Sequence, residues 1–233
     1  MNSVIRTSLT RLRTFRKLRS NVFSLMLLTA MVAGCAPGKS AKTSLNGETP
    51  IVPVAPTVTR LVDGRTGFVI LEPCDLSAPW RESFDKAVIR LEGQDYPGAI
   101  ALLEEVIQQS PDVTAPYINL GKAYRHNDQF DLAEKSLHKA LSLVANHPVA
   151  SHEYGLLLRH SGRFDEARAV YEAALEEFPE YEPIRLNLGI LCELYLNDLA
   201  CANEQYTRYS EANPDAQEVT VWLADLALRS AGR

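Results

Sequence analysis

The five histidines of the chain are the first candidates for metal chemistry. His126, His152 and His160 fall on predicted helices of neighbouring repeats, where they could approach one another on an inner face. Neutral imidazole is a frequent zinc ligand, but zinc sites usually complete the set with a carboxylate or a thiolate. The sequence places no such ligand with these three rings, so ordinary surface or groove histidines explain them better. We expect no metal and no cofactor.

The sequence also lacks the common motifs of hydrolytic catalysis. His152-Glu153 is not followed by a second histidine one helical turn later, as a zinc-protease helix requires. No Gly-x-Ser-x-Gly segment is present to expose a nucleophilic serine. Gly38-Lys39-Ser40 ends like a phosphate-binding loop, but Ala33 stands where that loop needs a glycine. We therefore predict that the chain is not an enzyme.

The charge of the chain is uneven along its length. The 233 residues carry a formal net charge of -5, yet residues 1–34 hold six basic residues and no acidic one. The remainder is therefore more acidic than the whole. Because phosphate binding needs a surplus of lysine and arginine, we expect no nucleic acid partner.

The basic N-terminus leads into a short apolar segment, Val22 to Gly34, that has no charged residue. At 1.5 Å per residue these thirteen residues reach only about 20 Å, less than the roughly 30 Å of a hydrocarbon layer. A basic start, a short apolar run and small residues at its end are typical of a secretory signal. The alternative, an uncleaved membrane helix, fits the length less well.

The end of this segment, Val32-Ala33-Gly34-Cys35, resembles the lipobox of bacterial lipoproteins. That resemblance implies thioether lipidation of Cys35 and cleavage before it. Several acyl chains would anchor the chain firmly, because each buried CH₂ contributes about 0.8 kcal/mol. Ala36 follows the cysteine, where an aspartate would resemble an inner-membrane retention signal. We therefore expect attachment to the periplasmic face of the outer membrane, with the inner membrane as the alternative.

The residues after Cys35 predict a flexible tether. Residues 36–66 are rich in Pro, Ser, Thr and Ala and have few large apolar side chains. The apolar run Gly67 to Glu72 is predicted to form a strand or an extended segment, with no clear role.

Small and apolar residues then recur every 34 residues. Tyr96, Phe130 and Phe164 share this spacing, as do the small residues at which two helices would cross closely. The small residues predicted to pack there are Ala87, Ala99, Gly121, Ala133, Gly155, Ala167, Gly189 and Ala202. Each unit offers two amphipathic stretches separated by a turn, and only stacked copies can bury such faces. One residue is inserted in the last copy, between Gly189 and Leu199.

This pattern resembles the tetratricopeptide repeat, in which two helices form a hairpin and successive hairpins stack. The resemblance implies an all-α solenoid of four repeats: 80–113, 114–147, 148–181 and 182–214. Val219, Trp222, Leu223 and Leu226 predict a C-terminal capping helix, with Trp222 in a packing role. The expected organisation is a signal peptide (1–34), a lipidated cysteine with a tether and extended segment (35–79), the repeats (80–214) and the cap (215–233).

Three cysteines remain beside Cys35. Cys192 and Cys201 lie on either side of the predicted turn near Asn197, so they would stand at similar heights on an antiparallel hairpin. An exported chain meets an oxidising space, where they could form a disulfide. The alternative is two small buried apolar residues, and the sequence leaves both open. Cys74 would stay unpaired.

The first helices of such a solenoid line its concave side, where the family usually holds a segment of a partner protein. By that resemblance the inward residues are Ile118, Asn119, Lys122, Arg125, His126, His152, Leu156, Arg159, His160, Leu186, Ile190 and Glu193. The basic members suit a ligand with carboxylates, although simple solvation explains them equally well.

The resemblance to envelope lipoproteins with these repeats implies a membrane-anchored adaptor in a pilus, secretion or energy-coupling assembly. The alternative is a periplasmic binding protein for a peptidoglycan fragment or a metal, held in the concave groove.

Overall fold

The computed structural model of the chain describes residues 32–36, 57–60, 68–73 and 76–231. The predicted signal peptide up to residue 31, most of the predicted tether and Cys74 lie outside these residues. The described helices are α2 (Ala78–Glu92), α3 (Tyr96–Gln109), α4 (Thr114–His126), α5 (Phe130–Leu143), α6 (Pro148–His160), α7 (Phe164–Glu177), α8 (Glu182–Leu194), α9 (Leu199–Ala212) and α10 (Gln217–Ala231). None of them is long and apolar enough to span a membrane.

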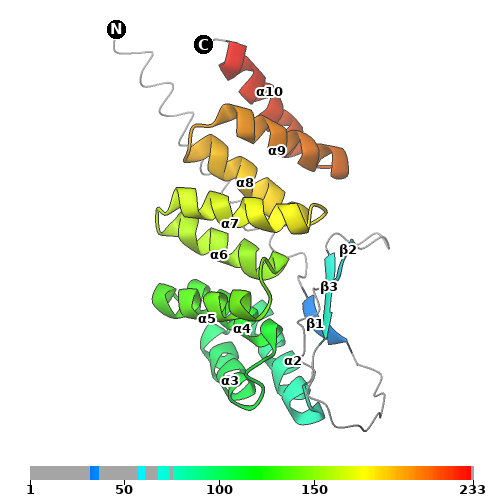
Figure 1. Cartoon of the computed structure of the whole chain (residues 1–233), viewed down its shortest axis with the longest axis vertical. Coiled ribbons are helices and arrows are strands. Elements are labelled where there is room, and N and C mark those ends of the chain that lie inside the picture. The colour runs from blue at the N-terminus through cyan, green and yellow to red at the C-terminus, as the bar shows by residue number, and fades with distance from the viewer. Residues whose placement is uncertain (1–31, 37–56, 61–67, 74–75, 232–233) are drawn as a thin grey trace, which may run out of the picture.

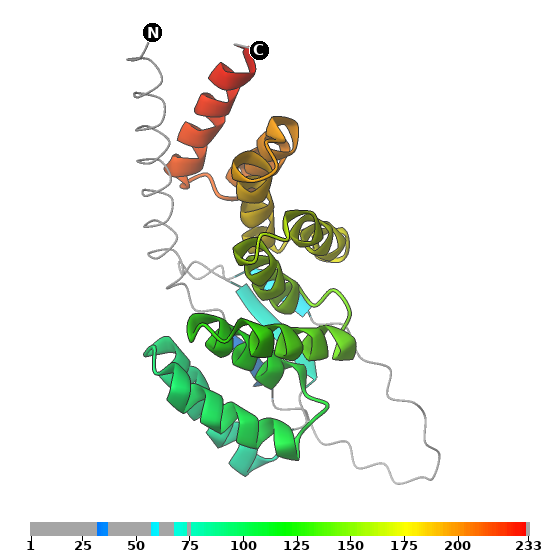
Figure 2. The same cartoon turned by 90° about the vertical axis from the view of Figure 1, so that its left-hand side faces the viewer.

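The helices form a two-layered solenoid of four hairpins followed by α10, as Figures 1 and 2 show. We call α2, α4, α6 and α8 the inner helices, because α4 contacts α2 and α6, and α6 contacts α8. The outer helices α3, α5 and α7 each pack on the inner helices before and after them, and the outer helix α9 packs on α8 and α10. The predicted all-α tetratricopeptide solenoid is confirmed.

Each hairpin turns through one residue in the left-handed region. Gly162 is the natural choice at such a position, since glycine has no Cβ to clash. The other repeats tolerate polar residues there, and the set is Gln94 (φ 62°), Asp128 (φ 58°), Gly162 (φ 77°) and Asn197 (φ 53°). Each of the four lies two residues before its outer helix, so the turn repeats with the sequence period.

The inserted residue of the last copy lies in the turn between α8 and α9. In the third repeat the Arg163 N–H donates to the Leu158 carbonyl at 2.9 Å, whereas in the fourth the Asp198 N–H reaches back one residue further, to the Cys192 carbonyl at 2.8 Å. The longer turn absorbs the extra residue, so both helices keep their packing faces.

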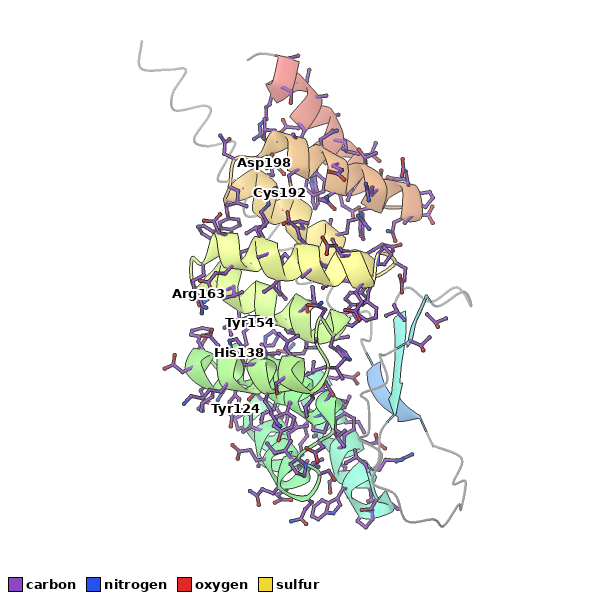
Figure 3. The ribbon with its side chains drawn as sticks, in the orientation of Figure 1. Tyr124, His138, Tyr154, Arg163, Cys192 and Asp198 are labelled. Atoms are coloured by element: carbon purple, nitrogen blue, oxygen red, sulfur yellow. A yellow bond between two sulfur atoms is a disulfide. The ribbon has the colours of Figure 1, made fainter. Side chains whose placement is uncertain are left out.

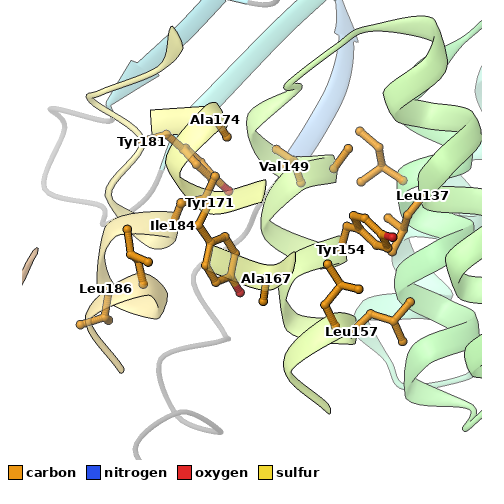
Figure 4. Close-up of a cluster of buried hydrophobic side chains, with 14 of the residues drawn as sticks. Leu137, Val149, Tyr154, Leu157, Ala167, Tyr171, Ala174, Tyr181, Ile184 and Leu186 are labelled. Atoms are coloured by element: carbon orange, nitrogen blue, oxygen red, sulfur yellow. The ribbon is translucent and has the colours of Figure 1, made fainter. Parts of the chain in front are cut away.

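The inner glycines mark where an inner helix touches its own outer helix. A Cβ placed on Gly155 would lie 2.1 Å from Cε1 of Tyr171, and one on Gly189 would lie 2.5 Å from Cε1 of Tyr206. Both tyrosines are fully buried. Figure 4 shows Tyr171 in this core beside Ala167. The glycines therefore make room for large rings between the two layers.

Gly155→Ala is expected to lower the free energy of unfolding by about 1–3 kcal/mol, because the added methyl group overlaps the buried Tyr171 ring. Thermal or urea unfolding measures this. Gly93→Ala is the matched control, since its Cβ would meet its nearest neighbour at 3.4 Å and should change little. Equal effects of the two substitutions would contradict the close-packing role.

The last helix, α10, covers the end of the stack. Val219, Trp222 and Leu226 are buried, and the Trp222 ring lies 5.4 Å from the ring of Tyr206. Leu223, predicted for the same face, is half-buried. Trp222 therefore has the packing role predicted for it.

A small sheet lies ahead of the repeats. Its strands are β1 (Val32–Ala36), β2 (Thr57–Arg60) and β3 (Phe68–Pro73), in the order β1-β3-β2. β1 runs parallel to β3, and β2 runs antiparallel to it. Strand β3 coincides with the run Gly67 to Glu72, predicted as a strand or extended segment, whereas β2 lies where we expected a flexible tether and β1 overlaps the predicted signal peptide. Alternating Thr57, Val58 and Thr59 and the apolar start of β3 have high strand propensity, which explains the difference.

The sheet sits against the inner helices near α4, as Figure 1 shows. β1 contacts α4, and Val58 of β2 packs against the core of the repeats. Cys35, the predicted lipidation site, lies within β1 and pairs with Glu72. The strand therefore spans the predicted cleavage site.

Candidate functional site

The residues predicted to line the groove lie on α4, α6 and α8, and their exposure divides them into three sets. The half-buried members are Lys122, Arg125, His126 and Arg159, and His160 is exposed. The buried members are Ile118, Asn119, His152, Leu156, Leu186, Ile190 and Glu193. Hydrogen bonds connect some of these residues with Glu153 and Asn187, which were not predicted. We call the five residues joined across α4, α6 and α8 the inner-face network: Arg125, His152, Glu153, Arg159 and Asn187.

A buried ion pair between α4 and α6 forms the centre of the network. The Nη2 and Nε atoms of Arg125 donate to Oε2 of Glu153 at 2.8 and 3.2 Å. The Glu153 side chain is only 2% exposed. Burial opposes ionisation of this carboxyl, but the positive charges of Arg125 and Lys122 outweigh it and lower the pKa of Glu153 to about 2. Glu153 is therefore a carboxylate at neutral pH and balances the charge of Arg125.

His152 connects this pair to α8. The Asn187 side chain accepts from Nη1 of Arg159 at 3.1 Å, so its amide nitrogen faces His152 and lies 2.9 Å from Nε2. Nε2 accepts this bond, which places the proton of the neutral ring on Nδ1. Nδ1 has no hydrogen-bond partner within the described part of the chain and lies 3.9 Å from Oε1 of Glu153. Burial lowers the pKa of His152 to about 4, although the Glu153 charge opposes this.

Arg159 and Lys122 are further basic residues of the inner face, beside the Arg125–Glu153 pair. The Arg159 guanidinium lies 6.0 Å from the Tyr195 ring centroid, within the range of a cation–π contact. Lys122 forms no ion pair with any residue that the structure describes. The inner face thus carries basic groups on α4 and α6, which suits a partner with acidic groups.

His126 and His160 have a packing role that the sequence analysis missed. The first residue of each of three outer helices stacks against the end of the next inner helix: Tyr96 on His126 at 5.1 Å, Phe130 on His160 at 4.4 Å and Phe164 on Tyr195 at 4.8 Å. We call these three contacts the ring pairs. The period of Tyr96, Phe130 and Phe164 was visible in the sequence, but their partners were not.

The ring pairs hold two of the three histidines that the sequence suggested as a metal-binding cluster. His126 and His160 are held at the ends of different helices, and His152 is buried with Asn187. Among the residues that the structure describes, no three His, Cys, Asp or Glu side chains are arranged to hold a metal ion.

A second polar cluster, labelled in Figure 3, links α5, α6 and α7 at the side of the solenoid. Tyr154 donates to Oε1 of Glu134 at 3.0 Å, Arg163 donates to the same oxygen at 2.6 Å, and Nε2 of His138 lies 2.9 Å from the tyrosine hydroxyl. Burial and the hydrogen bond to Glu134 raise the pKa of Tyr154 to about 12. The phenol therefore stays protonated at neutral pH, and the cluster ties successive repeats together. A Tyr124–Glu104 hydrogen bond joins α4 to α3 in a similar way.

Cys192 and Cys201 form a disulfide between α8 and α9, with an S–S distance of 2.07 Å and Cα atoms 5.9 Å apart. The bond bridges the lengthened turn of the fourth repeat. Asp198 strengthens the same turn, because its side chain caps α9 by accepting from the Cys201 N–H at 3.0 Å and also accepts from Arg168 of α7 at 3.1 Å.

Reduction of this disulfide is expected to lower the free energy of unfolding by about 2–3 kcal/mol, the loop-closure contribution of a short loop. Urea unfolding with and without a reductant measures it. The Cys192→Ala and Cys201→Ala double variant should lose a similar amount and should no longer respond to the reductant. A response that persists in the double variant would contradict the assignment.

The hairpins, their tight glycine crossings and the covering last helix define the class: an α-solenoid built of stacked helix pairs. Residues 112–176 match the family model described as tetratricopeptide repeat. This part of the chain is therefore built of tetratricopeptide repeats, a scaffold of the kind that binds other proteins, and the helices on either side of it continue the same solenoid. Lipidation at Cys35 stays a prediction.

Solved structures support the same fold. The chain resembles pilF of Pseudomonas aeruginosa (TM-score 0.60, 20% identity, covering 66% of this chain and 69% of that one). It also resembles MamA of Desulfovibrio magneticus RS-1 (TM-score 0.58, 19% identity, covering 66% and 87%). A third likeness is to a chain in the complex of Naa15 and Naa10 bound to HypK (TM-score 0.55, 21% identity, covering 64% and 22%). No curated protein sequence matches significantly.

Proposed function

We propose that the chain is a lipid-anchored adaptor of the bacterial envelope, which binds a partner protein through its inner helices. Three features support this proposal: the repeat scaffold, the lipobox-like sequence at Cys35 and the basic groups of the inner face. The observation that carries it is the placement of Lys122, Arg125 and Arg159 on the adjacent inner helices α4 and α6, where Arg125 pairs with the buried Glu153.

The partner chemistry follows from these groups. Lys122 and Arg159 are half-buried, so an approaching carboxylate would lose little water before meeting a positive charge. The inner helices also carry the apolar residues Leu156, Leu186 and Ile190. A protein segment that combines acidic and apolar side chains fits this face. The known complex of Naa15 and Naa10 with HypK provides a precedent for partner binding by a similar solenoid.

Site-specific crosslinking in intact cells tests the adaptor role. A photoreactive amino acid replaces Lys122 or Arg159 on the inner face, and, as matched controls, Lys135 or Glu172, which are exposed on the outer helices α5 and α7. We expect the two inner positions to capture the same protein and the outer positions to capture little. Equal capture from both faces would refute the proposed surface.

Metabolic labelling with a palmitate analogue tests the anchor separately. The chain should take up the label, and Cys35→Ala should remove it, because the thioether cannot form without the thiol. Cys35→Ser and wild-type chains should also differ in membrane fractionation. Label that persists in Cys35→Ala would refute lipidation at this residue.

A further inference from the structure

The central strand of the small sheet depends on a segment that leader cleavage would remove. β3 has one neighbour on each side: β2 pairs with it from Phe68 to Leu71, and β1 pairs with it from Val69 to Pro73. Cleavage before Cys35 would take away Val32, Ala33 and Gly34, the partners of Val69, Ile70 and Leu71.

The residue pairs between β1 and β3 that would remain after cleavage are too few to keep β1 paired as a strand. Only Cys35 with Glu72 and Ala36 with Pro73 would remain. Pro73 has no backbone N–H to contribute to a ladder. The backbone groups of Val69–Leu71 on this side would therefore lack partners in the mature chain, and an open strand edge is a template for another strand.

We propose that this edge of β3 is an acceptor for an extended segment of a partner protein, which runs parallel to β3 in the place of β1. The proposal rests on the leader processing in the proposed function. Main-chain hydrogen bonds to Val69–Leu71 supply the affinity of such strand addition. The contact of β1 with α4 shows that a strand in this place meets the helical layer as well as β3.

The segment that occupies the edge in the structure indicates the chemistry of the replacement. β1 reads Val-Ala-Gly-Cys-Ala, a run of small residues without charge. Small residues let a strand backbone lie close to a neighbouring helix. We infer that the partner segment is likewise uncharged and small, at least four to five residues long and free of proline.

The tether of the chain itself is a poor substitute for such a segment. Its apolar stretch, Val52 to Pro56, contains Pro53 and Pro56. In its proline-free stretch the uncharged residues Thr43–Gly47 lie between Lys42 and Glu48 and include Asn46 and Gly47, which are depleted in strands. Proline cannot donate to a ladder and is excluded from the interior of a paired strand. The same argument applies to the tether of a second copy, so the occupant is a different protein.

Hydrogen exchange on the mature chain tests the acceptor edge. The processed protein is purified from membranes, and mass spectrometry verifies that residues 1–34 are gone. A synthetic peptide of residues 30–37 then serves as the probe for the partner strand. We expect those amides of Val69–Leu71 that point away from β2 to exchange at least about tenfold more slowly with the peptide than without it, since paired amides must open before they exchange.

A peptide with Ala33→Pro is the matched control, because Ala33 pairs with Ile70 in the middle of β1. This peptide should give no protection. Protection by both peptides, or by neither, overturns the acceptor edge. Protection without any peptide in a chain that has become dimeric also overturns it, because the occupant is then a second copy. A leader that is still attached refutes the anchor in the proposed function instead, so the two failures are distinct.

Discussion

Arg125→Met is expected to lower the free energy of unfolding by about 3–5 kcal/mol, the usual effect of removing one partner from a buried ion pair. The substitution keeps most of the volume of the side chain but leaves the Glu153 carboxylate, 2% exposed, without the guanidinium that holds it at 2.8 Å. Lys122 and His152 remain nearby, but neither donates a hydrogen bond to Glu153 in the structure. Urea unfolding at neutral pH measures the loss.

The double variant Arg125→Met and Glu153→Gln separates the lost pairing from lost packing. Removing the buried charge as well should restore a large part of the stability, so the coupling energy of the cycle should be several-fold larger than that of an exposed pair. The exposed Arg208–Glu204 pair on α9 is the matched control, and Arg208→Met should change stability by less than about 1 kcal/mol. Additive effects of Arg125→Met and Glu153→Gln would contradict the role of the ion pair.

The stability of the chain is expected to fall as the pH drops from about 6.5 to about 4. In the folded state burial lowers the pKa of His152 from 6.5 to about 4, so in this window the unfolded chain binds a proton that the folded chain does not. The free energy of unfolding then decreases by up to about 1.4 kcal/mol per pH unit, on the order of 3 kcal/mol in all. The groups facing the ring are Glu153, which opposes the shift, and Arg125, Arg159 and Lys122, which favour it.

His152→Gln should remove most of this dependence, because glutamine does not titrate and can keep a bond to Asn187. Unfolding curves at a series of pH values between 4 and 7 compare the slopes of the variant and the wild type. His138→Gln, at a side chain that is 58% exposed, is the control and should keep the wild-type slope. The pKa of His126 is also lowered to about 4, mainly by burial, but this ring is partly exposed, so solvent screening reduces its contribution to a smaller residual slope. Below pH 4.5 Glu153 adds a further loss as its carboxylate becomes protonated.

Two classes of feature could be predicted from the sequence. The period of small residues at Gly121, Gly155 and Gly189 predicted the helix crossings, because only a missing Cβ allows the observed contacts with the facing Leu137, Tyr171 and Tyr206 side chains. The apolar spacing of Val219, Trp222 and Leu226 predicted the face that α10 buries. Both are local consequences of helical geometry, which a sequence carries directly.

The site was harder to predict, because it depends on contacts between repeats. Arg125 was recognised as a basic inner residue, but its neutralisation by Glu153 depends on how α4 and α6 face each other. Asn187, which orients His152, gave no signal, since a single polar residue on an apolar helix has many possible partners. The run at Gly67 to Glu72 was predicted as a strand or extended segment and forms β3, but β2 was missed because residues 36–66 suggested a tether. The pairing of β2 with β3 spans a separation that composition does not reveal.

The ring pairs have a consequence for shortening the molecule. Each of these contacts joins an outer helix to the inner helix after it, at about 0.5–1.5 kcal/mol beyond the burial of apolar surface. Truncating the chain after a complete hairpin, for example after α5, would therefore remove one partner of a ring pair and expose the other ring to water. Truncating it one helix later, after α6, would keep both rings of every remaining pair. The practical module of this protein is offset by one helix from the module that its sequence repeats.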